Sequence, residues 1–416
     1  MRVKLNTIPK TLKLNGKRVL LRVDFNVPLK KIGKLQKVAD PARLRHALPT
    51  IVRLSKAGAR LILVTHVGEP NGKIITKLRV RPIIDELARL LPDDIPRPKS
   101  IYHWRFNQLR QKVTALNNGE ILCLENVRFH KGEETNDPVF AKNLASLGNI
   151  YVNEAFSVSH RAHASLVGVC RYLPHYAGWR LAEEVAVLDR VSVRPRQPLV
   201  LVIGGAKVHD KTALMIKLAV LAKVILVAGV VANTLLKMKG ISVGRSLVDE
   251  HPAINSIKSL LKKRQAFFGF KEKIFLLQLP LDAVVSESPD GPARLIDFSA
   301  GQILKPTESI RDIGPQTMRL FSSFIRRAKT IIWNGPMGLI EQRSFRHGSL
   351  VVAEMIAARS KGKAFGLVGG GESISVLNET GMAEYVDYVS TGGGAMLEYL
   401  SGQSLPGLKC LKKSRY

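Results

Sequence analysis

The sequence predicts an α/β protein built from two doubly wound, Rossmann-like parallel-sheet domains. Short β-branched runs alternate with helical periods along almost all of the 416 residues. The predicted strands are apolar on both sides, which is typical of a parallel sheet covered by helices. A chain of 416 residues is also long enough for two domains with full-sized cores.

The first half supplies the elements of one such sheet. A helix over 41–56 is expected with Asp40 as its N-cap and Pro41 at its first position. The other predicted helices cover 82–91, 137–147 and an amphipathic stretch at 179–190. The predicted strands cover 18–23, 61–65, 121–124 and 150–153.

The alternation restarts after a proline-rich break at 194–198, which looks like a seam between domains. Helices are expected to end near residues 221 and 239. The predicted strands cover 199–203, 224–227, 274–277, 330–333, 364–368 and 385–389. Because open α/β sheets bind ligands beyond the carboxyl ends of their strands, we expect an active site in a cleft between the domains.

Composition indicates a soluble, cytoplasmic protein with no membrane association. The apolar fraction is 45% and the mean hydropathy is +0.04. The first ten residues lack the apolar core of a secretory signal, and the longest apolar run, 224–236, is too short to span a bilayer. Cys123, Cys170 and Cys410 lie far apart in the sequence without metal-ligand spacing, which fits reduced thiols.

The charge balance indicates an anionic partner without identifying it. There are 64 Lys and Arg against 33 Asp and Glu, a formal net charge of +31. Such a field attracts nucleic acid, anionic membranes or phosphorylated metabolites. The basic residues are scattered, however, and aromatics are only 6%, so no platform for single-stranded nucleic acid is indicated.

Two glycine triplets, 369–371 and 392–394, indicate phosphate binding. Each follows a β-type run and opens a predicted helix. Free backbone N–H groups and the positive end of a helix dipole meet at such a turn, and a Cβ would hold an anion away. Tight turns of any α/β protein also use glycine, but two successive triplets favour the functional interpretation.

Polar residues follow several strands of the first half. Asp24 and Asn26 share one face at the end of the first strand, and His66 and Arg128 follow later strands. Taken singly, each is a common loop or structural residue. The segment from His160 through Arg161 to His163 predicts a cationic cradle for a phosphorylated acid, and zinc is disfavoured because a third ligand is missing.

The second half carries a further phosphate-binding pattern. Gly204 and Gly205 end a strand, and Lys207 and Lys211 follow four residues apart on one helix face. Neither a Walker A loop nor a dinucleotide-binding fingerprint is present. A rigid turn over 333–338 can form one wall of a nucleotide pocket.

Taken together, these motifs resemble the phosphoglycerate kinase family over about residues 19–411. The stretches 22–28, 153–165, 204–211, 333–338 and 390–394 carry the resemblance in family order. The resemblance implies two doubly wound domains joined by a hinge helix. It implies an N-terminal domain over 1–178 that binds 3-phosphoglycerate, with the tail 402–416 packed on it, and a nucleotide-binding domain over 179–401.

The resemblance also implies residue roles. The substrate-binding positions are Asp24, Asn26, Arg43, His66, Arg128 and Arg161, flanked by His160 and His163. The nucleotide-binding positions are Gly204, Gly205, Lys207, Lys211, Asn334, Pro336, Glu341, Gly371, Glu372 and Ser373. Glu372 is implied as the Mg²⁺ ligand, and Glu184 as a hinge contact. Catalysis is implied for Arg43, Lys207 and the amides of Gly392, Gly393 and Gly394.

The implied reaction is reversible, Mg²⁺-dependent phosphoryl transfer between 1,3-bisphosphoglycerate with ADP and 3-phosphoglycerate with ATP. Its transition state is loose, so catalysis rests on positioning and electrostatics. The resemblance implies a cytoplasmic monomer that does not require nucleic acid or a membrane.

Three positions depart from the family pattern. Glu69 stands where family members usually have arginine, Glu372 where they have aspartate, and residues 228–230 replace a glycine-rich run. Two alternatives follow from the charge and from Glu69. One is a catalytically weakened kinase fold that binds nucleic acid or another polyanion, and the other is a kinase for a different acid.

Overall fold

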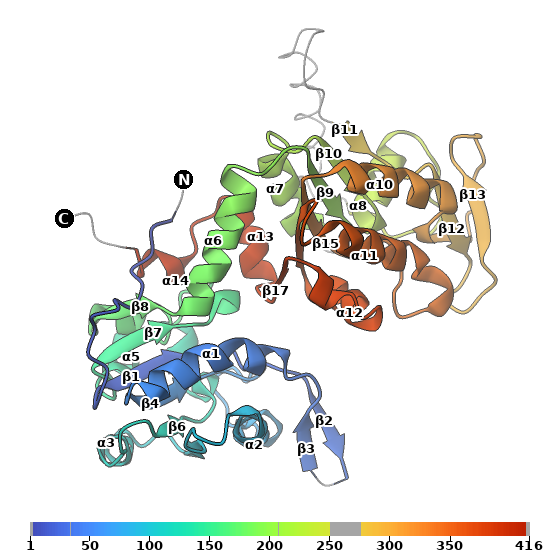
Figure 1. Cartoon of the computed structure of the whole chain (residues 1–416). Helices are drawn as coiled ribbons and strands as arrows, with labels where there is room; N and C mark the ends of the chain where they lie inside the picture. Colours follow the sequence, from blue (N-terminus) through green and yellow to red (C-terminus); the bar gives the residue numbers. More distant parts are fainter. Residues whose placement is uncertain (1–2, 34, 207, 250–275, 413–416) are drawn as a thin grey trace. The chain divides into compact units, whose positions relative to one another are not determined.

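The computed structural model describes residues 3–33, 35–206, 208–249 and 276–412. The chain divides into two compact units, which are labelled by element in Figure 1. Unit 1 comprises Met1–Ala186 and Ser404–Tyr416, and unit 2 comprises Val187–Gln403.

Unit 1 is built on a six-stranded parallel sheet in the order β5-β6-β4-β1-β7-β8. Its central strand β1 is flanked by β4 and β7, so the carboxyl ends of these three strands lie together. The predicted parallel sheet is confirmed. The strands are β1 Arg18–Arg22, β4 Arg60–Val64, β5 Lys99–Ser100, β6 Ile121–Cys123, β7 Ile150–Asn153 and β8 His175–Ala177.

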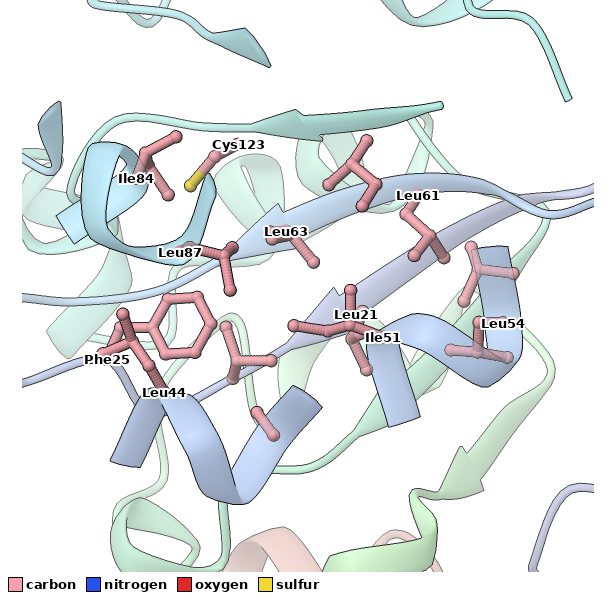
Figure 2. Packing of buried hydrophobic residues seen from close by; sticks show 14 of the residues in the cluster. Leu21, Phe25, Leu44, Ile51, Leu54, Leu61, Leu63, Ile84, Leu87 and Cys123 are labelled. Carbon is pink, nitrogen blue, oxygen red and sulfur yellow. The ribbon is translucent and has the colours of Figure 1, made fainter. Parts of the chain in front are cut away.

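Helix α1 (Ala42–Lys56) covers this sheet through one apolar face. Leu44, Ile51 and Leu54 are fully buried on that face, against Leu21 and Leu63 of the sheet (Figure 2). Helix α1 begins at Ala42 with Pro41 as its N-cap, so the predicted N-cap at Asp40 is wrong by one residue, although the Asp40 side chain accepts from the backbone N–H of Ala42 (2.9 Å). The remaining helices of unit 1 are α2 Arg81–Leu90, α3 Phe106–Thr114, α4 Lys131–Glu134, α5 Pro138–Ala145 and α14 Pro406–Lys409.

Short 3-10 helices and a hairpin complete unit 1. The antiparallel hairpin pairs β2 (Leu29–Ile32) with β3 (Leu35–Val38) and extends away from the sheet in Figure 1. The sequence did not predict this hairpin, because its strands carry lysines and no buried apolar face. The 3-10 helices are η1 Thr76–Leu78, η2 Val127–Phe129, η3 Phe156–Val158 and η4 Gly168–Arg171.

Unit 2 contains a second six-stranded parallel sheet, ordered β11-β10-β9-β15-β16-β17. The buried Trp333 on β15 lies within its core, among apolar side chains of the flanking helices. The strands are β9 Leu199–Ile203, β10 Val224–Val227, β11 Leu276–Gln278, β15 Thr330–Asn334, β16 Phe365–Gly369 and β17 Tyr388–Ser390. The strand predicted at 274–277 extends into residues outside the described ranges.

Unit 2 also carries a small antiparallel sheet, ordered β13-β12-β14, that was not predicted. Its strands are β12 Asp282–Ser286, β13 Arg294–Asp297 and β14 Ser309–Ile313. The helices of unit 2 are α7 Val208–Leu218, α8 Gly229–Met238, α10 Pro315–Arg327, α11 His347–Arg359, α12 Gly371–Glu379 and α13 Gly394–Leu400. The 3-10 helices are η5 Arg343–Phe345 and η6 Ala383–Tyr385.

The division between the units falls inside helix α6 (Trp179–Val193), after Ala186. This differs from the predicted boundary at 178 and from the proline-rich break at 194–198, which lies within unit 2. The reason is visible in the side-chain contacts of the helix. Arg53 stacks on Trp179 at its start, in unit 1, whereas Arg190 stacks on Phe365 near its end, in unit 2.

The segment after Ser404 pairs with the beginning of the chain in unit 1. Leu5 forms an antiparallel bridge with Lys412, and the backbone N–H of Asn6 donates to the carbonyl of Leu411 (2.8 Å). Among the described residues, no helix combines the length and the apolarity that crossing a bilayer would require.

Candidate active site

Asp24 and Arg43 form the centre of a polar cluster beyond the carboxyl end of β1. Nη1 of Arg43 on α1 donates to Oδ2 of Asp24 (2.6 Å) and to the carbonyl of Asn26 (3.1 Å). The hydroxyl of Ser157 also donates to Asp24. Burial alone would raise the pKa of Asp24, but the charge of Arg43 and the hydrogen bonds from Ser157 and from the backbone N–H of Asn26 lower it. Asp24 is therefore an anion that orients Arg43.

His66 follows β4 and is buried beside this cluster. Its Nδ1 lies 3.2 Å from Nη2 of Arg22, and a guanidinium can only donate. Nδ1 therefore accepts, and the ring proton is on Nε2. Burial is the main reason that the pKa of His66 is well below its usual value, with nearby arginines adding to the effect against the charge of Asp24. His66 is thus a neutral hydrogen-bonding group at neutral pH.

Arg128 on η2 is a buried cation held between acidic side chains. Its Nη1 donates to the carbonyl of Gly68 (2.9 Å), and its Nε lies 3.4 Å from Oε1 of Glu134. Oε1 of Glu69 lies 3.7 Å from Nη1. The Glu69 side chain is 74% exposed, whereas that of Arg128 is 6% exposed. Asn26 lies nearby, because its Oδ1 accepts from the backbone N–H of Gly68 (2.9 Å).

The segment after η3 differs from the cationic cradle expected from the sequence. Arg161 is exposed, but His160 is half-buried and His163 is buried. Burial, reinforced by Arg128 and Arg22, lowers the pKa of His163 to about 4, and burial with Arg161 lowers that of His160. At neutral pH the charge of this segment therefore comes from Arg161, while the imidazoles are neutral.

Sequence reasoning missed the buried network that supports these residues. Nε of Arg22 donates to the hydroxyl of Ser165 (2.9 Å), which donates to Oε1 of Glu133 (2.6 Å). The backbone N–H of Ser165 donates to the other oxygen of Glu133 (2.9 Å). The available signal was an arginine inside an otherwise apolar strand, since a buried charge requires partners. Glu133 itself could not be found because Arg22, which it reaches through Ser165, is more than a hundred residues away in the sequence.

In unit 2, the turn after β9 lies against the turn after β15. The backbone N–H of Gly205 donates to the carbonyl of Pro336 (2.7 Å). Gly205 and Gly335 have φ values of +73° and +90°, which L-residues rarely adopt. A Cβ on Gly204 would lie 1.9 Å from the carbonyl oxygen of Pro336. Glycine is therefore needed for the two turns to approach.

Lys211 on α7 brings a buried ammonium group to these turns. Its Nζ donates to the carbonyl of Gly204. A Cβ built on Gly205 or on Gly335 would lie 2.8 Å from that Nζ. A Cβ on Gly205 would also lie 3.3 Å from Oε2 of Glu372. One ammonium and one carboxylate thus flank the same glycine turn.

The predicted helix start at the first glycine triplet is confirmed at α12, which begins at Gly371. The buried Ser373 hydroxyl accepts from the backbone N–H of Gly335 (2.8 Å). The side-chain amide of Asn334 donates to the carbonyl of Gly369 (2.9 Å). The side chains of Asn334 and Ser373 therefore join the turn after β15 to the turn after β16. Glu372 in the first turn of α12 and Glu341 are exposed.

The second glycine triplet opens α13 at Gly394. The backbone N–H of Gly392 donates to the hydroxyl of Ser390 (3.1 Å). Gly393 has φ +50°, and a Cβ on Gly393 or Gly394 would meet nothing within 4 Å. The start of this helix therefore offers open backbone. Lys207, predicted to act on the transferred group, lies outside the described residues.

The donor set can be tested for a metal. Among the residues that the structure describes, no group of three or more His, Cys, Asp or Glu side chains could hold an ion. Mg²⁺ bound with phosphates takes one or two carboxylates and keeps its other ligands as phosphate oxygens and water. The exposed carboxylate of Glu372 beside a phosphate-binding type of turn fits that mode.

The chain is similar to phosphoglycerate kinases over nearly its whole length. The family model described as phosphoglycerate kinase matches residues 10–403. A phosphoglycerate kinase from Moorella thermoacetica is 41% identical over 406 residues, covering 97% of this chain and 98% of that protein. One from Chloroflexus aggregans is 39% identical over 401 residues, covering 95% of this chain and 96% of that protein.

Solved structures give the same result. A phosphoglycerate kinase from Coxiella burnetii superposes with a TM-score of 0.80 at 35% identity, covering 97% of each chain. The enzyme from Pyrococcus horikoshii OT3 has a TM-score of 0.77 at 30% identity, covering 97% of this chain and 98% of that one. Both the sequence and the fold therefore point to one family.

Proposed function

The chain belongs to the phosphoglycerate kinase family, and from this membership we propose where each substrate binds and which residues act on it. The protein is a phosphotransferase with a carboxyl group as acceptor. It interconverts 1,3-bisphosphoglycerate and ADP with 3-phosphoglycerate and ATP. No observation favours the alternative of a polyanion-binding protein that has lost this activity.

Unit 1 binds 3-phosphoglycerate in this proposal. The phosphate and carboxylate of the acid are bound by Arg43, Arg128 and Arg161, whose guanidinium groups suit both anions. Asp24 keeps Arg43 oriented, and its side chain with Asn26 offers partners for the hydroxyl of the acid. The imidazole rings of His66, His160 and His163 are neutral, so in this proposal they offer the acid hydrogen bonds rather than charge.

Unit 2 binds the nucleotide. The carrying observation is the buried Nζ of Lys211 against the glycine turn at 204–205, since an ammonium group suits phosphates. Asn334, Pro336 and Glu341 form the nucleoside side of the pocket. Gly371, Glu372 and Ser373 begin the helix on the phosphate side.

Mg²⁺ is held by Glu372 in this proposal. When bound, the ion neutralises charge on the nucleotide phosphates. The protein supplies the remaining charge compensation through Lys207, Lys211 and Arg43. The amides of Gly392, Gly393 and Gly394 would receive the oxygens of the transferring group. Catalysis is then positioning and electrostatic stabilisation, because phosphoryl transfer passes through a loose transition state.

ATP consumption with MgATP and rising 3-phosphoglycerate tests this assignment. We expect saturable turnover that falls at least about a hundredfold in Lys207→Ala, since a lysine on the transferring group stabilises the transition state. Lys217→Ala is the matched control, because it removes the same charge from an exposed position on α7, ten residues later in the sequence. Unchanged turnover in Lys207→Ala would contradict the role of Lys207. No turnover in the parent protein, with nucleotide still bound, would contradict the proposed function.

A further inference from the structure

Two of the three cysteines meet in unit 1. Cys170 lies on η4. Cys410 directly follows α14 and is 240 positions later in the sequence. Their sulfur atoms lie 2.9 Å apart, and both residues are half-buried. Cys123 is different, because it is fully buried in the core of unit 1. The scatter of the cysteines along the sequence fits reduced thiols, and the fold brings this pair together.

The surroundings of the pair favour the protonated thiol of Cys170. Both sulfur atoms approach the carbonyl of Leu166, at 3.5 Å for Cys170 and 3.4 Å for Cys410. Cys410 also lies 3.3 Å from the carbonyl of Gly407. The hydrogen bond to Cys410, followed by burial, raises the pKa of Cys170 above its usual value. A protonated thiol is a poor nucleophile, so exchange at Cys170 with any disulfide is slow at neutral pH.

We propose that Cys170 and Cys410 are a reversible disulfide site that fixes the segment 404–412 to the rest of unit 1. The co-reactant is a low-molecular-weight disulfide. One cysteine sulfur attacks it, forms a mixed disulfide and releases one small thiol. The second cysteine sulfur attacks the mixed disulfide and releases the other small thiol. The protein loses two electrons and two protons, and both pass to the released thiols.

The segment 404–412 contacts the loop that carries His160 and His163 of the candidate site. The backbone N–H of Gly407 donates to the carbonyl of Ser159 (2.8 Å), and a Cβ on Gly407 would lie 3.0 Å from Cα of Ser159. The next residue along the chain is His160. The connection of this disulfide to acid binding rests on the proposed function, whereas the disulfide itself does not.

Peptide mapping of the full-length protein after incubation with glutathione disulfide tests the site. We expect one cross-linked peptide pair joining Cys170 to Cys410, lighter by two hydrogen atoms, while Cys123 remains available for alkylation after unfolding. Cys170→Ser and Cys410→Ser should lack this product, and Cys123→Ala should retain it. Stable glutathione adducts on single cysteines, or cross-links between two molecules, would overturn the proposal.

Thermal unfolding and hydrogen exchange test the fixing of the segment. A bond that closes so long a loop should raise the Tm of unit 1 by about 5 °C, reversibly with a reductant, and slow amide exchange over 404–412. Cys170→Ser should lose both effects. Cross-linking that changes neither quantity would overturn the proposed fixing. These measurements do not use kinase activity, so a failure of the proposed function would leave them unaffected.

Discussion

At the scale of single residues, burial decides the charge with which each polar group acts. Glu154 follows β7 in unit 1, and its Oε1 accepts from the hydroxyl of Thr50 (2.6 Å) and from the backbone N–H of Arg180 (2.8 Å). Its Oε2 is buried without a hydrogen-bond partner among the described residues. Burial therefore raises the pKa of Glu154 to about 7 despite these hydrogen bonds.

This pKa predicts a pH dependence of stability. Between pH 4.5, the ordinary pKa of a glutamate side chain, and about pH 7, the folded state holds a proton that the unfolded state has released, so stability falls as pH rises through this window. The loss is on the order of 3 kcal/mol for unit 1. Glu154→Gln should remove most of it, as measured by urea unfolding at pH 5 and pH 8.

Glu183→Gln is the matched control. Glu183 is exposed on α6, the helix whose Arg180 backbone N–H donates to Glu154. It should keep the pH dependence of the parent protein. A Glu154→Gln variant with the same pH dependence would contradict the assigned pKa. Asp312 in unit 2 also has its pKa raised to about 7 by burial. The stability of unit 2 should therefore still fall with rising pH in the Glu154→Gln variant.

Glu69 predicts weakened acid binding. Its exposed carboxylate lies 3.7 Å from Nη1 of Arg128, where it competes with an anionic ligand. Glu69→Arg should lower the KM for 3-phosphoglycerate by about fivefold with little change in kcat, because an exposed charge contributes at most about 1 kcal/mol. Steady-state kinetics would check this.

Glu384→Arg changes the net charge by the same amount on an exposed residue of unit 2, and serves as the control for Glu69→Arg. It should leave the KM for the acid unchanged. An equal fall of KM in both variants would assign the effect to overall charge rather than to the position of Glu69.

At the scale of elements, glycine acts differently at turns and at helix starts. Gly335 has φ +90°, and a Cβ there would lie 2.2 Å from the carbonyl oxygen of Gly204. Gly335→Ala should therefore destabilise unit 2 by at least about 2 kcal/mol in denaturant unfolding. Gly371→Ala is the control, because its Cβ would meet nothing within 4 Å. Equal stability of the two variants would contradict this explanation.

Gly394→Ala separates folding from catalysis. A Cβ there meets nothing within 4 Å, so the stability should stay within about 0.5 kcal/mol of the parent protein. The same Cβ would hold a phosphoryl group away from the helix start, so kcat should fall by about tenfold or more. A variant with unchanged kcat would show that the amides of α13 do not contact the transferring group.

The sequence predicted helices and strands best where a single hydrophobic periodicity dominated a segment. The apolar strands β7, β9 and β10 begin and end where expected, because both faces of these strands are buried. The hairpin was missed because its strands carry lysines and no buried residue, and the antiparallel sheet because charged residues interrupt or bound its short apolar runs. At the candidate site, the sequence singled out polar residues that follow strands, such as Asp24 after β1 and Lys211 on the helix after β9. It could not identify partners such as Glu133, because only the fold brings them close.

At the scale of the whole molecule, the net charge of +31 predicts salt-sensitive kinetics. A positive field concentrates anionic substrates, and raising salt from about 0.1 M to about 1 M shortens its range from about 10 Å to about 3 Å. We expect kcat/KM for 3-phosphoglycerate to fall by about tenfold between these concentrations. Sucrose at matched osmolality should have little effect, and a flat salt response would contradict electrostatic attraction.

The split composition of unit 1 has a consequence for biosynthesis. Unit 2 consists of one continuous stretch, whereas unit 1 is completed by residues from Ser404 onward, which are translated after all of unit 2. Domains fold as their residues leave the ribosome. The first 186 residues therefore lack the strand bridge to Leu5 until all of unit 2 has been translated. Until then the chain presents an unfinished surface on which chaperones can act.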